Sequence, residues 1–467
     1  MGKPHACGGG SCTEGGVVGS IDKSSASHHQ SPQGGASSVQ RTRAAGLAQV
    51  VEDRSSMRAE HLEVRWRRPE ELDARELQAW TGLESRAAEP NVYLSPHFVL
   101  PALRHLDASL RPVIAWIEAG TGAARELVGV GVFRRSPGSR SFPWPHLSAY
   151  LSCHSFLGGL LLEAERLDVA VAALMRTIGG LSPWQGLVLP KTDCDGPLAR
   201  ALARQTDRRG LSMLSLGPQE RAMLDMSRCG EDMLRELLGK KLNEINRCRR
   251  RLAEMGELSW HCLGQGEPLP ASAVENFLHL EHQGWKGESG TSVRAVPAEE
   301  AFFREMVARF DAEGRALFTE LRLDGRAIAS TCNFISGTMG FAFKVGWDPE
   351  LRKFGPGMLN EIEFIRQGRE RCPQLTMFES GASSDSFISK LWPGRRELGA
   401  LLVPGNRVAG AAMLAAERLR QSRRRVAETT DAGAAEGLSE SRGTSEPASV
   451  PGRTSAGSVT QVTSTST

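Results

Sequence analysis

The sequence contains no run of eighteen apolar residues, and it therefore predicts no transmembrane helix. Its N-terminus also has no apolar segment of the kind that forms the core of a secretory signal. The acidic residues Glu14 and Asp22 and the many glycines of this region argue against an organellar transit peptide. These absences lead us to expect a cytoplasmic protein.

Spaced metal ligands are missing as well. The nine cysteines are scattered, and no cluster of histidines or cysteines completes a zinc site around Cys7 and Cys12. His28 and His29 lie in a polar tail, where a solvated pair is the simpler interpretation. We expect no metal cofactor and a reducing compartment, in which cysteines stay unpaired.

No charge of one sign dominates. The 467 residues include 57 basic and 54 acidic side chains, so the formal net charge of +3 does not indicate a nucleic-acid-binding protein. The length allows two domains and flanking tails. Residues 1–58 and 429–467 are rich in glycine, serine and threonine, and we expect both tails to be disordered.

What the sequence does contain is an alternation of strand and helix signals, clearest between residues 316 and 392. Short turn sequences with glycine separate three strand-like runs, which predict antiparallel strands at Ala316–Leu323, Arg326–Ile335 and Met339–Val345. A helix and a fourth strand, Gln374–Ser380, follow. Because a helix connects them, the third and fourth strands are expected to be parallel.

A glycine-rich turn precedes that helix. Phe354-Gly355-Pro356-Gly357 breaks the chain, and apolar residues then recur at helical spacing from Met358. The first free amides of a helix favour an anion, and Arg352 and Lys353 add positive charge nearby. The pattern alone is also typical of an ordinary turn and cap, so it favours a phosphate-binding loop only together with the neighbouring strands.

Three antiparallel strands, a glycine loop, a helix and a crossover strand together resemble the core of GNAT N-acyltransferases. The resemblance extends over residues 60–405 and is nearest to the FemAB-like branch, especially the cellulose-biosynthesis-type acetyltransferases. The motifs that carry it are Arg249-Arg250-Arg251-Leu252 with Gly256, Trp285-Lys286-Gly287 with Gly290-Thr291, Leu323-Asp324-Gly325 with Ile328-Ala329, Gly355-Pro356-Gly357, and Lys390 with Trp392.

The resemblance implies a mixed α/β fold with tandem GNAT-like domains and an acyl-CoA co-substrate. In the family, the loop amides hold the pyrophosphate of acetyl-CoA, which assigns donor binding to Arg352, Lys353, Phe354, Gly355, Gly357, Met358 and Leu359. Pro356 removes one amide donor. The tyrosine that often precedes the late lysine of the family is absent, and the two tyrosines, Tyr93 and Tyr150, lie far upstream. A tyrosine general acid is therefore not expected near the leaving thiolate.

The remaining elements divide the chain into segments. We predict an N-terminal GNAT-like domain over residues 59–217, a C-terminal acyl-CoA-binding domain over residues 218–405 and a basic helix over residues 406–428. The second domain begins with one long helix, Glu231–Gly256, whose cationic residues are mostly solvated. A helical wheel places Arg249 on the apolar side of that helix. We expect Arg249 to face the space between the two domains and to pair with an anion.

Acyl transfer needs a bound donor, a deprotonated amine and a stabilised oxyanion. Glu379 is the first candidate for the base, with Asp385 next, although an ion-paired structural role is also open for Glu379 and catalysis by proximity alone needs neither. His154 lies in a His-Ser-Phe-Leu-Gly segment that resembles a family signature; it is either a residue near the substrate or a structural hydrogen-bond donor. The substrate-binding candidates are Arg249, Trp285, Lys286, His154 and Lys390.

We therefore expect an acyl-CoA-dependent N-acyltransferase whose acceptor is a small amine or a sugar-linked amine, in polysaccharide or cell-envelope metabolism. Two alternatives remain open at this stage. One is a FemAB-like enzyme that takes its donor from aminoacyl-tRNA, in which case the basic helix contacts RNA phosphates. The other is a GNAT-like scaffold in polysaccharide assembly without turnover. The sequence leaves the acceptor, the acyl chain length and the oligomeric state undetermined.

Overall fold

The computed structural model of the protein describes residues 62–180, 184–283, 287 and 289–422. The tails predicted to be disordered lie outside these residues, and so do Trp285 and Lys286. Residues 407–422, within the predicted basic helix, are helical. No helix in the described ranges is both long and apolar enough to cross a bilayer.

The first part of the chain builds one repeat of a simple topology: a strand, two helices, three antiparallel strands, a helix, a parallel strand and a helix. Its elements in chain order are β1 (Leu62–Arg67), α1 (Ala74–Glu84), α2 (Pro96–His105), β2 (Val113–Ala119), β3 (Glu126–Ser136), β4 (His146–Ala149), α3 (Leu167–Gly180), β6 (Gly186–Asp193) and α4 (Pro197–Arg208). The short strand β5 (Leu161–Leu162) pairs with β3. We call this part the first unit.

The second part repeats the same order of elements and the same pairing directions. Its elements are β8 (Leu258–Gly264), α7 (Ala271–His282), α9 (Pro297–Ala312), β9 (Ala316–Leu323), β10 (Arg326–Ser336), β11 (Met339–Trp347), α10 (Pro356–Arg371), β12 (Met377–Glu379) and α11 (Ile388–Leu391). We call this part the second unit. The prediction of a mixed α/β fold with tandem GNAT-like units is confirmed.

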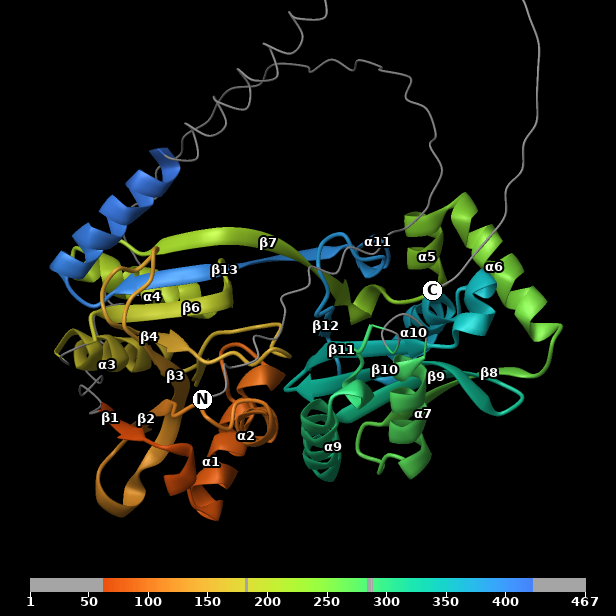
Figure 1. The fold of residues 1–467 in the computed structure, drawn as a ribbon, viewed down its shortest axis with the longest axis horizontal. Coiled ribbons are helices and arrows are strands. Elements are labelled where there is room, and N and C mark those ends of the chain that lie inside the picture. Colours follow the sequence, from red (N-terminus) through yellow and green to blue (C-terminus); the bar gives the residue numbers. More distant parts are fainter. Residues whose placement is uncertain (1–61, 181–183, 284–286, 288, 423–467) are drawn as a thin grey trace, which may run out of the picture. The chain divides into compact units, whose positions relative to one another are not determined.

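The two units exchange their last strands. β7 (Leu214–Asp225) follows the first unit in the chain but pairs with β12 of the second, whereas β13 (Gly394–Pro404) follows the second unit and pairs with β6 of the first. β7 and β13 also pair with each other, so a single thirteen-stranded sheet results (Figure 1). The boundary that we proposed at residues 217 and 218 falls within β7.

The predicted hairpins of the second unit are confirmed. β9 has the predicted bounds, and β10 and β11 start where predicted. The turn between β9 and β10 places Asp324 and Gly325 at φ of +50° and +76°, which is a conformation that Asp and Gly tolerate better than other residues. β12 is shorter than predicted but is parallel to β11, as expected.

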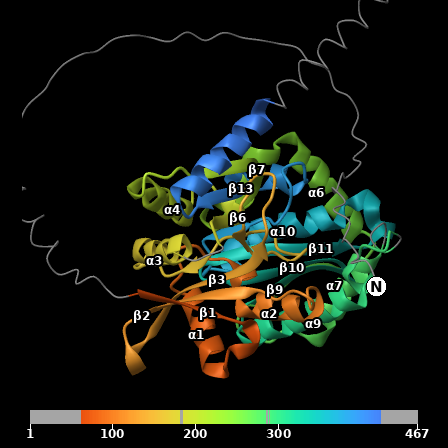
Figure 2. The same ribbon diagram turned by 60° about the vertical axis from the view of Figure 1, so that its left-hand side comes forward.

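The helices of the second unit cover both faces of its strands. Figures 1 and 2 show α10 with α5 (Glu231–Leu238) and α6 (Lys240–Ala253) on one face, and α7 with α9 on the other. The prediction of one long helix over Glu231–Gly256 is wrong. Gly239 adopts φ of +49° and ψ of −122°, which only glycine does readily, and this residue separates α5 from α6.

Aromatic side chains of both units share one core. The ring of Phe98 from α2 lies 5.4 Å from Phe302 of α9, and the ring of Tyr93 lies 6.2 Å from Phe341 of β11. Both pairs meet edge to face, the arrangement that aromatic rings prefer. Full burial of each such ring stabilises the folded state by about 1.5–3 kcal/mol, so the junction of the units is part of the hydrophobic core.

Candidate functional site

The connection from β11 to α10 has the geometry of a helix start that binds an anion. A 3-10 helix, η7 (Pro349–Phe354), begins with Asp348, whose side chain accepts a hydrogen bond from the amide of Glu350 at 3.0 Å. It ends at Gly355, with φ of +63° and ψ of +55°. Only glycine takes up this left-handed conformation without strain. The chain therefore passes from η7 directly into α10, which begins at Pro356.

The first turn of α10 offers two backbone amides to a ligand. Pro356 has no N–H, and the amide of Leu359 donates to the carbonyl of Gly355 at 2.9 Å. No described residue accepts a hydrogen bond from the amide of Gly357 or Met358. The helix dipole makes this end of α10 favourable for negative charge. Arg352 and Lys353 are exposed just before this turn, so the loop is suited to phosphate.

Of the other residues predicted to hold the donor, Phe354, Gly357 and Leu359 are packed inward, whereas the side chain of Met358 is exposed. The side chains of Phe354 and Leu359 are buried in a cluster that includes Leu252 of α6, so only their backbone is available to a ligand. A Cβ atom on Gly357 would lie 3.2 Å from Cδ1 of Trp347. Packing alone therefore favours glycine at position 357, in addition to any need for close approach of a ligand.

Strands β11 and β12 separate soon after they meet. Only Met339, Gly340 and Phe341 of β11 pair with β12, whereas β11 continues to Trp347. The register with β10 also shifts at this point, leaving Phe343 as an extra residue in β11. From Ala342 to Trp347 β11 continues beyond its pairing with β12 for about 17 Å, at about 3.3 Å per residue. An extended donor held at the α10 loop would lie along this part of β11, with its reactive end near Phe343.

The segment of the first unit that contains Ser155 and Phe156 covers the place where β11 and β12 separate. The ring of Phe156 lies 5.8 Å from that of Phe343, and its Cδ2 is 3.1 Å from the position of a Cβ on Gly381. Two cations hold the segment: Lys191 donates to the carbonyl of Ser155 at 2.8 Å, and Arg221 to that of Phe156 at 3.2 Å. The site is thus built from both units.

Glu379, the first candidate for the base, lies at the end of β12 and is completely buried. Its Oε1 is 3.3 Å from Nε of Arg221, and its Oε2 accepts the amide of Gly381 at 3.2 Å. Burial raises the pKa of Glu379, while the charges of Arg221 and Arg396 act in the opposite direction. The carboxylate is therefore engaged in an ion pair, and its role as a base stays a prediction.

Tyr93 approaches the site from the first unit, which the sequence did not lead us to expect. It is buried, its hydroxyl has no hydrogen-bond partner among the described residues, and its ring contacts Phe341, the residue that pairs with Glu379. Burial, aided by the charge of Glu379, raises the pKa of Tyr93 well above its usual value. A tyrosine is therefore present near the separated strands, although its phenol is strongly held in the neutral form.

His154 also lies at this junction. Its Nε2 is 3.0 Å from Oε2 of Glu299, in the first turn of α9, and its ring stacks on Phe302 at 5.5 Å. Nearby, Nζ of Lys344 on β11 is 3.9 Å from Oε1 of Glu281 on α7. Sequence reasoning missed Glu299 and Lys344 as site residues, because a carboxylate in the first turn of a helix and a lysine in a strand carry no specific signal.

Apart from Arg249, the other predicted residues are exposed or lie outside the described ranges. Asp385 and Lys390 are exposed, the first in the loop after β12 and the second in α11. Hydrogen bonding to Ser383 lowers the pKa of Asp385. The described residues also hold no group of three or more histidine, cysteine or carboxylate side chains placed to bind a metal.

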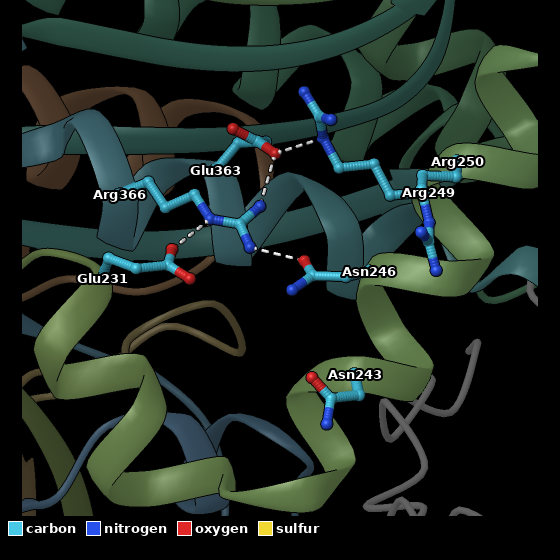
Figure 3. A pocket seen from close by; sticks show the side chains of 7 residues that line it. All are labelled: Glu231, Asn243, Asn246, Arg249, Arg250, Glu363 and Arg366. Carbon is cyan, nitrogen blue, oxygen red and sulfur yellow. Dashed lines mark hydrogen bonds and ion pairs between the residues drawn. The ribbon is translucent and has the colours of Figure 1, made fainter.

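Arg249 lines a pocket of about 610 Å³ between α5, α6 and α10 (Figure 3). Every lining side chain is charged or an amide: Glu231, Asn243, Asn246, Arg249, Arg250, Glu363 and Arg366. Because ligand pockets for apolar groups are lined mainly by hydrophobic side chains, this pocket is unsuited to an acyl chain. The expected location of Arg249 between the units is wrong, because the inward side of α6, on which the wheel placed Arg249, faces α10 and not the first unit.

The anion that pairs with Arg249 is Glu363. Its Oε1 accepts from Nε of Arg249 at 2.8 Å and from Arg366 at 2.8 Å, and Arg366 also contacts Glu231 and Asn246 (Figure 3). Arg249→Leu is expected to lower the free energy of unfolding by about 1 kcal/mol or less, because its side chain is 43% exposed and Glu363 keeps Arg366. The matched change Arg250→Leu should be nearly silent.

Urea unfolding of both variants, together with calorimetric titration of acetyl-CoA, measures these effects. A loss of donor or acceptor binding confined to Arg249→Leu would show that Arg249 binds substrate, as the sequence suggested, and that its pairing with Glu363 is secondary.

Comparison with known proteins identifies the class of the second unit. Residues 239–387 match the family model described as Acetyltransferase (GNAT) domain. No curated protein matches significantly. Among solved structures, FemX is 10% identical, with a TM-score of 0.46, over 70% of this chain and 96% of its own. A tandem GNAT protein from the clavulanic acid biosynthesis pathway is 15% identical, with a TM-score of 0.37, over 74% and 99%.

A further similar structure is the C-terminal domain of a putative lysylphosphatidylglycerol synthetase from Agrobacterium fabrum. It is 14% identical, with a TM-score of 0.44, over 73% of this chain and 94% of its own. Residues 239–387 thus form a GNAT-type acetyltransferase domain, and the prediction of a transferase is confirmed through this domain.

Proposed function

We propose that the protein transfers an acyl group from acetyl-CoA or a longer acyl-CoA to the amine of a small or sugar-linked acceptor. The observation that carries this proposal is the succession of the α10 loop, with its two open amides, and the part of β11 that continues beyond its pairing with β12. Phosphates suit the loop, and an extended thioester arm can run alongside an extended strand. Polysaccharide or cell-envelope metabolism is the proposed setting.

The residues at the start of α10 are suited to such a donor. The amides of Gly357 and Met358 would receive phosphate oxygens, and the exposed Arg352 and Lys353 would add charge-assisted contacts. The donor would supply an activated thioester. The chain would hold it in place, exclude water near Phe343 through the covering segment of the first unit, and present buried ionisable groups to the acceptor.

The double variant Arg352→Ala/Lys353→Ala is expected to weaken acetyl-CoA binding about 10- to 100-fold, since a contact with a charged group contributes about 1.5–3 kcal/mol. Both side chains are exposed, so the melting temperature should change little. Isothermal titration with acetyl-CoA measures the effect, and Arg176→Ala, which removes an exposed cation from α3, is the control. Unchanged affinity in the double variant, or no binding by the parent protein, would contradict the proposal.

One observation favours a second candidate, transfer from aminoacyl-tRNA as in the FemAB-like branch. Lys240, Lys241, Arg250 and Arg251 on α6 are exposed, and cations of this kind bind nucleic-acid phosphates. A salt-sensitive gel shift with tRNA, in the absence of any acyl-CoA binding, would favour this donor over acyl-CoA.

A further inference from the structure

A buried histidine–carboxylate pair joins the two units at the reactive end of the proposed donor path. Nε2 of His154 is 3.0 Å from Oε2 of Glu299, and the side chains are 10% and 19% exposed. The imidazole stacks on Phe302 with an interplanar angle of 11° and meets the edge of Phe343 at 6.0 Å. Because both rings belong to the core of the second unit, they fix where the imidazole of the first unit lies.

The location of this pair matters because Phe343 marks the point where β11 leaves β12. The register of β11 against β10 shifts there, and β12 has already ended at Glu379. The donor loop follows the other end of β11, and Trp347 at that end lies about 13 Å from Phe343, at about 3.3 Å per residue. A group bound by its phosphates at that loop would bring its far end, the thioester, to the neighbourhood of His154.

The charges around the pair favour an ionised Glu299. Burial by itself would raise the pKa of Glu299, but His154 and the charge of Lys344 lower it overall. Lys344 is in turn 3.9 Å from Glu281 of α7. Lys191 and Arg221 donate to the carbonyls of Ser155 and Phe156, which follow His154 in the chain. The charged groups around the pair are therefore Lys344 from β11, which acts on Glu299, its partner Glu281, and the cations Lys191 and Arg221.

We propose that His154 accepts the proton of the acceptor amine during acyl transfer and that Glu299 is its positioning residue; this rests on the proposed function. Glu299 faces Nε2, which leaves Nδ1 as the basic nitrogen. The amine nitrogen attacks the thioester carbonyl carbon and forms the C–N bond, and Nδ1 takes the N–H proton. The C–S bond then breaks, and the thiolate leaves with a proton from the imidazolium. A carboxylate beside an imidazole stabilises the imidazolium that forms in such a step.

Glu379 is the competing candidate, and the structure distinguishes its situation from that of His154. Glu379 is completely buried, pairs with Arg221 at 3.3 Å and accepts the amide of Gly381. Arg221 and the Gly381 amide act against the rise that burial causes in the pKa of Glu379, without cancelling it. His154 keeps part of its surface exposed and contacts a carboxylate rather than a cation, which is the arrangement that a base needs to take up a proton.

The test compares His154→Gln, Glu299→Gln and Glu379→Gln in the full-length chain. Acetyl-CoA binding is measured first by calorimetry, and transfer to ethanolamine and glucosamine is then followed through the released thiol between pH 5.5 and 9. His154→Gln should lower kcat/KM by about 100-fold or more, the usual contribution of a positioned base, without changing acetyl-CoA affinity. Glu299→Gln should lower it by a smaller factor and move the acidic limb of the pH profile to lower pH, since an imidazolium there would lose its neighbouring negative charge.

Glu379→Gln should keep the pH profile of the parent protein. Melting curves and far-UV circular dichroism show whether each variant is folded. If His154→Gln proves unstable, Glu299→Asp provides the test instead: because it keeps the carboxylate, it should recover part of the rate that Glu299→Gln loses. An unchanged pH profile in Glu299→Gln, loss of transfer confined to Glu379→Gln, or absence of transfer by a parent protein that binds acetyl-CoA would each overturn the inference. Failure of the parent protein to bind acetyl-CoA would instead overturn the proposed function.

Discussion

Replacing Arg315 by methionine is expected to lower the free energy of unfolding by about 3–5 kcal/mol, because a buried carboxylate would lose its cation. Arg315 immediately precedes β9 in the second unit. Both of its terminal nitrogens contact Glu84 at the end of α1 in the first unit, one of them at 3.1 Å. Glu84 is 3% exposed and would keep only the hydroxyl of Ser95, at 2.7 Å, among its described partners.

Urea unfolding at neutral pH measures this loss, with Arg309→Met as the control. Arg309 pairs with Glu305 one helical turn away, and both side chains are more exposed than those of the first pair, so its loss should cost about 1 kcal/mol or less. The double variant Arg315→Met/Glu84→Leu should recover most of the stability, because it leaves no unpaired buried charge. Similar losses in Arg315→Met and Arg309→Met would show that the Arg315 pair is no better protected from water than a surface pair.

This ion pair bears on function because the proposed site is divided between the units. His154 comes from the first unit, whereas Glu299, Phe343 and the donor loop come from the second. The exchanged strands β7 and β13 tie the units together through the sheet, and the Arg315–Glu84 pair does so through buried charge. A change that loosens the junction is therefore expected to impair transfer before it impairs donor binding.

The second unit was largely predictable from sequence because its structure is set by local signals. Glycine at Gly325 and Gly337, with φ of +76° and +55°, permits the turns that separate β9, β10 and β11. The same holds for Gly355 before α10, where a left-handed residue and the following proline fix the helix start. Such signals depend on neighbouring residues only, and so they can be read without knowing the rest of the fold.

The strand exchange and the composition of the site depend on contacts between distant residues. Nothing in the sequence of β7 or β13 indicates which of two similar sheets each strand joins, because alternation sets a face but not a partner. Gly239 also misled the prediction: a lone glycine is tolerated within a helix, yet here it ends one. The wheel still placed Arg249 correctly on the inward side of α6, where it pairs with Glu363, but it could not show that this side faces α10 and not the first unit.

Tyr93, Glu299 and Lys344 show the same limit at the site. Tyr93 appeared irrelevant because it lies far upstream, but the junction of the units brings it against Phe341. Glu299 resembles an ordinary first-turn carboxylate, which the helix dipole favours in any case. Only the fold places it 3.0 Å from His154. Residues whose role arises from the meeting of two units carry no signal in either unit alone.

Replacing Glu361 by glutamine is expected to stabilise the protein by about 3 kcal/mol at pH 8 and to have little effect near pH 4.5, since one pKa unit corresponds to about 1.36 kcal/mol. Glu361 is buried on the inner side of α10, where it accepts a hydrogen bond from the hydroxyl of Thr331 at 3.1 Å. Burial raises the pKa of this carboxyl from 4.5 to about 7.

The sign follows from proton binding. Between pH 4.5 and about 7 the unfolded chain has lost this proton while the folded protein keeps it, so stability falls as the pH rises through this window and the loss is complete above it. Glutamine mimics the neutral carboxyl at every pH and removes this loss. Urea unfolding of both proteins at pH 5 and pH 8 isolates the effect, with the exposed Glu370 of the same helix changed to glutamine as the control. If Glu361→Gln differs in stability from the parent protein by the same amount at both pH values, the folded protein does not raise the pKa of Glu361. The Glu361 carboxylate would then be a buried anion that α10 tolerates within two turns of the donor loop.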